Sequence, residues 1–232
     1  MNKNKISIII PCLNEEAHIL STLQPLQSLR QRGHEIIIVD GGSTDNTIKL
    51  ATDLYDQLIS SEKGRAVQMN NAAQVSANDI LCFLHADTLA PENMDSLILN
   101  AMQNSHKIWG RFNVKLSGKH WLFRIIETSI NIRSCISGVA SGDQGIFVYR
   151  NVFIKLNGFK PIPLMEDIEL SKRLKEKSRP VCIANTPLIT SSRRWEKHGI
   201  LQTVFLMWQL RLKFFMGVPA KQLVNLYRPH DK

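Results

Sequence analysis

The sequence predicts an α/β fold in which a Rossmann-like, mostly parallel central sheet is flanked by helices. Two short runs rich in Ile and Val, residues 6–11 (ISIIIP) and 35–40 (EIIIVD), end in polar or turn residues, as buried parallel strands do. Between them, apolar residues recur every three or four positions, which is the spacing of an amphipathic helix. Strands that alternate with helices in this way favour a parallel sheet.

The first hundred residues continue this alternation. The helix between the first two strands places Ile19, Leu23, Leu26 and Leu29 on one face and ends at Gly33. After the turn GGSTDN we expect a helix at 47–54, a weak strand at 57–60, a helix at 65–75, a buried strand at 79–84 and a helix at 91–103. This part is therefore predicted to be a nucleotide-binding half.

The pattern changes after Gly110. We expect a strand at 111–116 (RFNVKL), an amphipathic stretch at 121–132, a strand at 145–149 (GIFVY) and a helix that ends near Glu176. The sequence contains no internal repeat, low-complexity tract or linker rich in Pro, Gly or Ser. We therefore expect a single domain over residues 1–232.

The composition narrows the class of protein. A chain of 232 residues with 44% hydrophobic and 21% charged residues can bury one substantial core. The four cysteines lie far apart, without C-x-x-C spacing, and indicate neither a zinc site nor a disulfide framework. The apolar run at 6–10 is too short for a signal peptide, so we expect a reduced, cytoplasmic setting.

The net charge of +9 indicates an acidic partner, which can be nucleic acid, anionic lipid or a phosphorylated small molecule. Charge alone does not choose among these three. Much of the excess lies at 172–179 and 193–221, where individual lysines are also explained by a solvated basic face.

Polar clusters follow three of the predicted strands, namely CLNEE at 12–16, DGGSTD at 40–45 and HADT at 85–88. Ligands of open α/β sheets bind beyond the carboxyl ends of the strands, so these clusters are expected to meet at one edge. Asp45 alone is explained as a turn or helix-capping residue. That interpretation explains the convergence of three clusters poorly.

Asp87 and His85 are the candidate metal ligands. A carboxylate at a strand end can bind a hard cation that also takes two phosphate oxygens, whereas a packed histidine is the alternative for His85. Lys63 and Arg65 lie just before a predicted helix and add cations and backbone donors suited to phosphate.

In this order and spacing, the motifs resemble the family-two glycosyltransferases with a GT-A fold. The matching segments are ISIIIPCLNEE at 6–16, VDGGSTD at 39–45, Gly64-Arg65, NNA at 70–72, FLHADT at 83–88, SGDQG at 141–145, PLMEDIEL at 163–170 and RRW at 193–195. The resemblance is closest to a small bacterial subgroup labelled arsenosugar-biosynthesis-type glycosyltransferases. It implies a nucleotide-sugar-binding half at 1–105, an acceptor and catalytic half at 106–198 and a C-terminal helical segment at 199–232.

The resemblance also implies roles for individual residues. Asp40 is expected to bind the base or ribose of the nucleotide, and Asp87 with His85 to stand where the family has its D-x-D metal motif. Because His85 replaces the first acidic residue of that motif, the metal is expected to arrive with the diphosphate. The implied substrate-binding residues are Pro11, Asn14, Glu15, Asp40, Gly41, Lys63, Arg65, Asp143, Gln144, Arg194 and Trp195.

Asp167, with Glu166 beside it, matches the family's catalytic base. Inverting transfer requires an acceptor hydroxyl to lose its proton while Mn²⁺ or Mg²⁺ takes up charge on the departing diphosphate, for which a UDP-sugar is the expected donor. The alternative is that both carboxylates stabilise the N-terminus of their helix, and the two interpretations are compatible. Glu169 is expected to be an exposed helix residue.

Two further segments have competing interpretations. Asp143 and Gln144 either contact the donor sugar or acceptor, or form a simple turn. Arg193, Arg194, Trp195 and His198 either close over the diphosphate or form a basic surface around a buried tryptophan, and the role of His198 stays open.

Two other functions are compatible with parts of the sequence. A sugar-nucleotide nucleotidyltransferase would need a glycine-rich, lysine-bearing loop near the N-terminus, where this chain has PCLNEE. A non-catalytic nucleic-acid-binding module would use the basic charge, but Asp40, Asp87 and Asp167 would repel phosphate without a metal. We therefore expect no nucleic-acid partner and a small-molecule or lipid-linked acceptor.

The segment at 200–218 is apolar almost all round as a helix, and it is shorter than the about 20 residues that cross a bilayer. We expect it to be buried against another element or in a homodimer. Association with the inner face of a membrane is the second alternative, because basic residues flank the segment.

Overall fold

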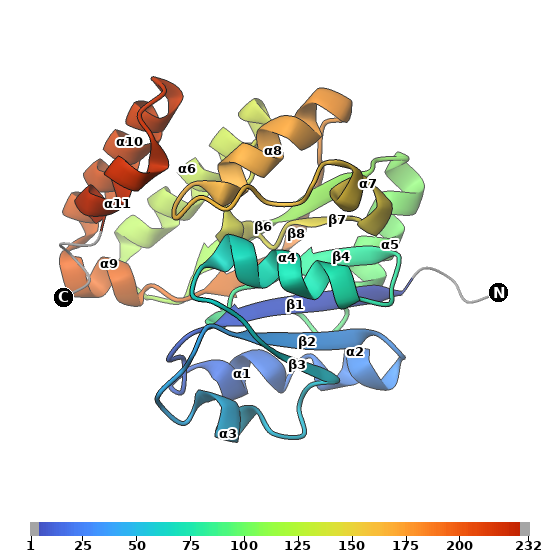
Figure 1. Cartoon of the computed structure of the whole chain (residues 1–232). Coiled ribbons are helices and arrows are strands. Elements are labelled where there is room, and N and C mark those ends of the chain that lie inside the picture. Colours follow the sequence, from blue (N-terminus) through green and yellow to red (C-terminus); the bar gives the residue numbers. More distant parts are fainter. Residues whose placement is uncertain (1–4, 228–232) are drawn as a thin grey trace.

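The computed structural model describes residues 5–227, so the two ends of the predicted domain, 1–4 and 228–232, lie outside it. One eight-stranded sheet runs through the molecule in the order β3-β2-β1-β4-β7-β6-β8-β5 (Figure 1). The strands are β1 (Ile6–Cys12), β2 (Glu35–Asp40), β3 (Gln57–Ser60), β4 (Ile80–Phe83), β5 (Thr88–Leu89), β6 (Trp109–Leu116), β7 (Phe147–Tyr149) and β8 (Val181–Thr190).

The helices of the first half are α1 (Ile19–Leu23), α2 (Gln27–Gln31), α3 (Thr47–Ala51), α4 (Arg65–Val75) and α5 (Met94–Ser105). Those of the second half are α6 (Trp121–Ser137), the 3₁₀ turn η1 (Gly142–Gln144), α7 (Arg150–Lys155), α8 (Glu166–Lys177), α9 (Arg193–His198), α10 (Ile200–Phe215) and α11 (Ala220–Tyr227).

The sheet is parallel in its first half and mixed in its second. β3, β2, β1 and β4 pair in parallel, as the alternation of strands and helices predicts. β7 then pairs antiparallel with both β4 and β6, and β5 pairs antiparallel with β8. β1, β2 and β4 therefore end at the same edge, on the side where α9 lies in Figure 1.

Each face of the sheet is covered by its own layer of helices. On one face, the side chains of β1 and β2 that include Ile8 and Ile36 pack with Leu23 of α1, Leu29 of α2 and Ile98 of α5. On the other face, the alternate residues of the same strands pack with α4, α7 and α8 in a cluster that contains Ile9, Ile37, Met69, Phe153 and Leu170. Because both faces are covered, the central positions of β2 and all of β4 are apolar and buried rather than alternating.

The helix expected to end at Gly33 is two helices. α1 ends at Leu23 and α2 begins at Gln27, with Pro25 between them. Proline lacks the backbone N–H that a continuous helix needs, so the prediction of one helix was wrong in overlooking Pro25. The chain does turn at Gly33, whose φ of +84° is the left-handed conformation that glycine adopts readily.

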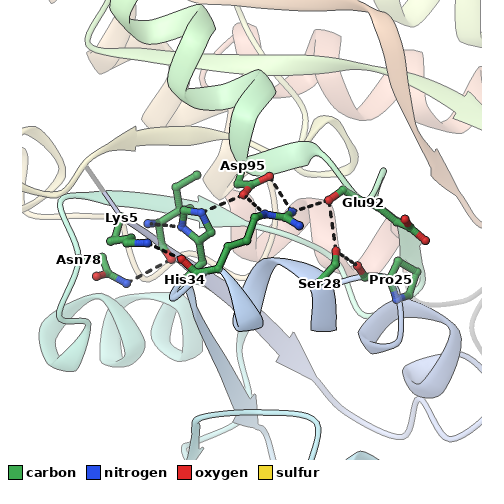
Figure 2. Close-up of polar contacts among 9 residues, drawn as sticks. Lys5, Pro25, Ser28, His34, Asn78, Glu92 and Asp95 are labelled. Carbon is green, nitrogen blue, oxygen red and sulfur yellow. Dashed lines mark hydrogen bonds and ion pairs between the residues drawn. The ribbon is translucent and has the colours of Figure 1, made fainter. Parts of the chain in front are cut away.

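A buried polar cluster ties α5 to the strands at the end of the sheet away from the site (Figure 2). Asp95, in the first turn of α5, accepts hydrogen bonds from Arg32 Nε at 2.6 Å and Nη2 at 2.9 Å, and its Oδ2 lies 3.0 Å from His34 Nε2. The other ring nitrogen of His34 accepts a hydrogen bond from the Ile6 amide at 3.1 Å. Burial lowers the pKa of His34, although Asp95 opposes the shift. This cluster links the start of β1 to α5 through an imidazole that is neutral at pH 7.

The C-terminal helices pack on the second half of the molecule. Leu210 of α10 and Leu223 of α11 belong to a cluster with Val139, Met165 and Ile168. The prediction that 200–218 is buried holds for this inner side, but the opposite side of α10 is exposed. No helix among the described residues has the length and apolar character needed to span a membrane.

Candidate active site

The loops after β1 and β2 hold each other at the carboxyl edge of the sheet. Both oxygens of Asp40 accept the Ser43 amide, at 2.9 and 3.2 Å, and Ser43 Oγ accepts the Asn14 amide at 3.0 Å. Asn14 has a φ of +55°, and its Oδ1 accepts the Thr44 amide at 2.8 Å. The structure thus brings Asn14 and Asp40 together as predicted, and Asn14 shapes the loop in which Asp40 stands.

Gln68 of α4 clamps the ends of the two strands. Its Nε2 donates to the carbonyl of Cys12 at 3.0 Å and to that of Val39 at 2.7 Å. A Cβ on Gly41 would lie 3.1 Å from this same nitrogen, so glycine leaves room for the clamp. The sequence analysis missed Gln68. The signal was a glutamine beside Met69 in a helix whose neighbours Ala66, Ala72 and Ala73 face the core.

Asp45 is a turn residue, as the simpler interpretation has it. Its Oδ1 accepts the Thr47 amide at 2.9 Å and the Thr47 hydroxyl at 2.5 Å, and its Oδ2 accepts the Glu16 amide at 3.2 Å. Pro11, predicted to line the nucleotide pocket, is a buried residue of β1 opposite Val39.

A chain of charged and polar groups crosses from the end of β4 to the start of α8. Arg65 Nη1 lies 3.2 Å from His85 Nε2, and Arg65 Nε lies 3.6 Å from Glu166 Oε1. Burial lowers the pKa of His85 and the charge of Arg65 lowers it further, which favours a neutral imidazole whose Nε2 accepts a hydrogen bond from the guanidinium N–H. Burial raises the pKa of Glu166, against the effect of Arg65.

Asp167 stands in the first turn of α8 with both oxygens held by backbone amides. Its Oδ2 accepts the Gly142 amide at 2.6 Å, and its Oδ1 accepts the Ile168 amide at 2.7 Å. A Cβ on Gly142 would lie 2.6 Å from His85 Nε2 and 3.6 Å from Asp167 Oδ2. His85 and Asp167 therefore lie around Gly142, which joins β4, η1 and α8 into one site.

Of the two polar residues in η1, Gln144 is engaged and Asp143 is not. Gln144 is fully buried, and its Oε1 accepts the Ser141 amide at 3.1 Å, so its side chain shapes the turn. Asp143 Oδ1 is buried and receives no hydrogen bond from the described part of the chain. Asp143 Oδ1 is thus a buried polar atom whose partner the described residues do not supply.

The basic segment before α10 reaches the site through Arg193 rather than Arg194. Arg193 Nη2 lies 3.4 Å from Glu15 Oε2 in the loop after β1. Arg194 instead stacks on Tyr227 of α11, with its Cζ 3.6 Å from the ring centre. Trp195 and His198 are half-buried beside them, whereas Lys63 is exposed ahead of α4.

The residues present fit a cation that brings ligands of its own. Over residues 5–227, no group of three or more His, Cys, Asp or Glu side chains is arranged to hold a metal ion. Asp87 is half-buried and follows β4. The pKa of Glu15 is raised mainly by the burial of Glu15 itself, and the negative charge of Asp87 raises it further, against the effect of Arg193. A single carboxylate is suited to a divalent cation whose remaining ligands are phosphate oxygens and water.

Comparisons with known proteins identify the family of this chain. The family model described as Glycosyl transferase family 2 matches residues 7–154. The probable glycosyltransferase YdaM of Bacillus subtilis (strain 168) is 28% identical over 199 residues, covering 73% of this chain and 46% of that protein. The poly-beta-1,6-N-acetyl-D-glucosamine synthase of Staphylococcus aureus (strain COL) is 23% identical over 186 residues, covering 73% and 45%. The chain spans about half the length of these curated relatives.

Solved structures show the same fold. S. aureus TarS 1-349 superimposes with a TM-score of 0.68 at 15% identity, covering 82% of this chain and 61% of that one. Glucosyl-3-phosphoglycerate synthase from Mycobacterium tuberculosis, in complex with Mg²⁺ and UDP, gives 0.59 at 18% identity, covering 82% and 70%. The mannosyltransferase PcManGT from Pyrobaculum calidifontis, in complex with GDP-Man and Mn²⁺, gives 0.62 at 18% identity, covering 91% and 61%. The predicted α/β fold of GT-A type is confirmed.

Proposed function

Since this chain belongs to glycosyl transferase family 2, we propose that it is a glycosyltransferase and that it moves a sugar from a nucleoside-diphosphate sugar to an acceptor hydroxyl with inversion. The observation that carries the proposal is the Gly142 amide on Asp167, which places a carboxylate beside His85 and Arg65. Family membership favours transfer over the nucleotidyltransferase and nucleic-acid-binding alternatives.

The donor is proposed to be a UDP-sugar. The TarS structure has also been solved with UDP and with UDP-GlcNAc, and the M. tuberculosis synthase with UDP. In this chain, Asp40 and Glu15 offer acceptors for the base and ribose at the edge that Gln68 holds open. Arg65 and Arg193 supply positive charge for the diphosphate, and each is more than two-fifths exposed.

Asp87 is the residue that would hold Mn²⁺ or Mg²⁺, with His85 beside it. When bound, the cation neutralises charge on the departing diphosphate. Arg65 complements this role, because its guanidinium already balances Glu166 and can turn towards a phosphate oxygen. The neutral imidazole of His85 leaves the positive charge of Arg65 for the anion.

Asp167 is proposed as the base that takes the proton from the acceptor hydroxyl. Two backbone N–H groups hold its carboxylate in one orientation, and the N-terminus of α8 stabilises its negative charge. Glu166 is less suited to this role, because burial favours its protonated form and its carboxylate faces Arg65. Its role is to hold Arg65 in place.

A thermal-shift screen tests the donor part of the proposal. UDP with Mn²⁺ is expected to raise the melting temperature, because a ligand that binds only the native state stabilises it. GDP, ADP and CDP with Mn²⁺ are the comparison set, and UDP without metal is the control. Stabilisation by none of the four nucleotides would contradict nucleoside-diphosphate-sugar transfer.

The stereochemistry of transfer tests the mechanism separately. NMR of the anomeric proton in the first product formed from a UDP-α-sugar is expected to show a β linkage. A product with the α linkage would exclude the single-displacement role of Asp167.

A further inference from the structure

α10 carries a continuous row of exposed apolar side chains. Its members follow one another at intervals of four, three, four, three and one, and are Leu201, Phe205, Trp208, Leu212, Phe215 and Met216. Each is between 58% and 73% exposed. With 3.6 residues per turn, these positions share an arc of about 100° on one side of the helix.

The opposite side of α10 is fixed to the body of the protein. Thr203 and Leu210 are its buried residues, and Leu210 belongs to the cluster that contains Met165 and Ile168. The exposed row therefore points away from the core. Over residues 5–227, Lys172 Nζ of α8 lies over the ring of Phe215, 4.2 Å from its centre, and every member of the row remains more than half exposed. Six large side chains in one row exceed the scattered apolar residues of an ordinary soluble surface.

The borders of the row are polar and basic. One side of the arc is bordered by Lys213, Gln202 and Gln209, and the other side is bordered by Arg211. From 191 to 227 the chain contains six basic residues, Arg193, Arg194, Lys197, Arg211, Lys213 and Lys221, and a single acidic residue, Glu196. The apolar row thus lies within a strongly positive region.

A second apolar row lies on α6. Trp121, Ile125, Ile132 and Ile136 are between 53% and 73% exposed, at spacings of four, seven and four. Arg133 of α6 and Arg211 of α10 interact electrostatically. Burial lowers the pKa of Arg133 to about 10, and the charge of Arg211 contributes to this shift.

We propose that the exposed row of α10 docks this protein on the surface of a membrane that contains anionic lipid. Trp, Phe and Leu on one side of a helix with Lys and Arg at its borders form the pattern of a helix that lies in the interface. Anionic headgroups complement the six basic residues. A second copy of the chain does not complement these basic residues, because pairing two α10 rows would bring two positively charged borders together.

The position of the row also bears on the acceptor. α10 packs on Met165 and Ile168, which flank Glu166 and Asp167, so the docking helix and the proposed base belong to neighbouring surfaces. This inference about the acceptor rests on the proposed function: a base beside a membrane-docked helix is suited to an acceptor whose hydroxyl lies at the lipid surface.

Vesicle flotation of the full chain tests the docking. The parent is expected to float with vesicles of phosphatidylcholine containing phosphatidylglycerol, more strongly than with phosphatidylcholine alone, and to stay partly bound at 150 mM salt. Phe205→Ser/Trp208→Ser/Leu212→Ser is expected to lower vesicle affinity at least tenfold. Leu58→Ser/Val75→Ser removes exposed apolar side chains from the other half and is expected to bind as the parent does.

The readout is independent of sugar transfer. Melting temperature and its shift with UDP and Mn²⁺ verify that the triple variant is folded, and vesicle binding requires no donor. Equal flotation of the triple variant and the parent would overturn the proposal. It would also be overturned if the parent binds no vesicle while sedimentation equilibrium shows a dimer that the triple variant cannot form, because a second copy would then cover the row.

Discussion

The amide of Gly142 donates a hydrogen bond of 2.6 Å to Oδ2 of Asp167, across 25 positions of sequence. This bond connects η1, which precedes β7, to the first turn of α8. A side chain at this position would require the ring of His85 to move, because a Cβ there would lie 2.6 Å from His85 Nε2. The orientation of the proposed base thus depends on a glycine that carries no reactive group.

Gly142→Ala is expected to destabilise the protein and to lower transfer. Overpacking of this kind costs about 1–3 kcal/mol, which corresponds to about 2–4 °C in melting temperature per kcal/mol at this chain length. Thermal unfolding measures the effect. The His85→Ala background lacks the clashing ring. In that background Gly142→Ala is therefore expected to cost much less stability than it does in the parent protein. A double variant as unstable as the sum of both single changes would show that the clash is not the cause.

Asp167→Asn is expected to keep the fold and nucleotide binding but to lose transfer. The amide oxygen can still accept one of the two backbone N–H groups, that of Gly142, although the Ile168 N–H loses its acceptor. The side chain no longer takes a proton from a hydroxyl. Removal of a general base costs about 100-fold to 10,000-fold in rate. Initial-rate assays measure kcat, with Glu176→Gln at the exposed end of the same helix as the matched control. Near-normal turnover would exclude Asp167 as the base.

Asp87→Ala is expected to abolish the part of UDP stabilisation that depends on Mn²⁺. Without the carboxylate, the cation has only phosphate oxygens and water to bind. The comparison is the melting temperature with UDP alone and with UDP plus Mn²⁺. Asp79→Ala, an exposed residue at the opposite end of β4, is expected to respond as the parent does. If Asp87→Ala retains the full metal response and His85→Ala loses it, the ligand is His85.

Acidification is expected to destabilise the protein through the cluster around His34. Burial lowers the folded-state pKa of His34, so the unfolded chain binds more protons as the pH falls through the ordinary value of 6.5. Asp95 adds a further loss of folding stability at lower pH. Burial is the largest single effect on the pKa of Asp95 and raises it, but the hydrogen bonds from Arg32 and the Ser96 amide and the charges of Arg32 and His34 together lower the pKa below its usual value. The stability that Asp95 contributes is therefore lost as the pH falls through the folded value.

Urea unfolding at pH 7.5 and 5.5 measures this dependence. His34→Gln keeps an acceptor for the Ile6 amide but does not titrate, so the difference in unfolding free energy between the two pH values is expected to shrink. His18→Gln, half-buried just before α1, is the control and is expected to keep the parent's difference. An unchanged difference in His34→Gln would assign the pH dependence to another group.

The elements that the sequence predicts well are those with a simple burial pattern. β2 and α4 begin and end where they were predicted. β2 is one apolar run between turn residues, and α4 begins directly after Gly64 and buries one side that contains Ala66, Met69, Ala72 and Ala73. β8 was missed. Its burial alternates irregularly, with Ala184 and Asn185 exposed, and its partner β6 shifts register between Phe112 and Val114. Such irregularity follows from strand pairing and leaves no periodic signal in one chain segment.

The candidate site was predictable by residue type but not by contact. The order of strands and helices was enough to expect Asp40, Asp87 and His85 at one edge, since parallel strands end together. The sequence did not predict which arginine faces the loop after β1, because Arg193 and Arg194 are adjacent and differ only in the direction in which they leave α9. The clamp by Gln68 also required coordinates, since its two carbonyl partners lie 56 and 29 positions away.

The place of β7 in the sheet has a consequence for how the chain folds as it is synthesised. β4 is complete at Phe83, yet its neighbour on one side, β7, begins only at Phe147. When β1 to β4 have left the ribosome, the apolar strand Ile80–Phe83 therefore has one unpaired edge until more than sixty further residues have been synthesised. Unpaired apolar edges promote aggregation. Fragments that stop before β7 are thus expected to need a chaperone, whereas chains that include it can close the sheet.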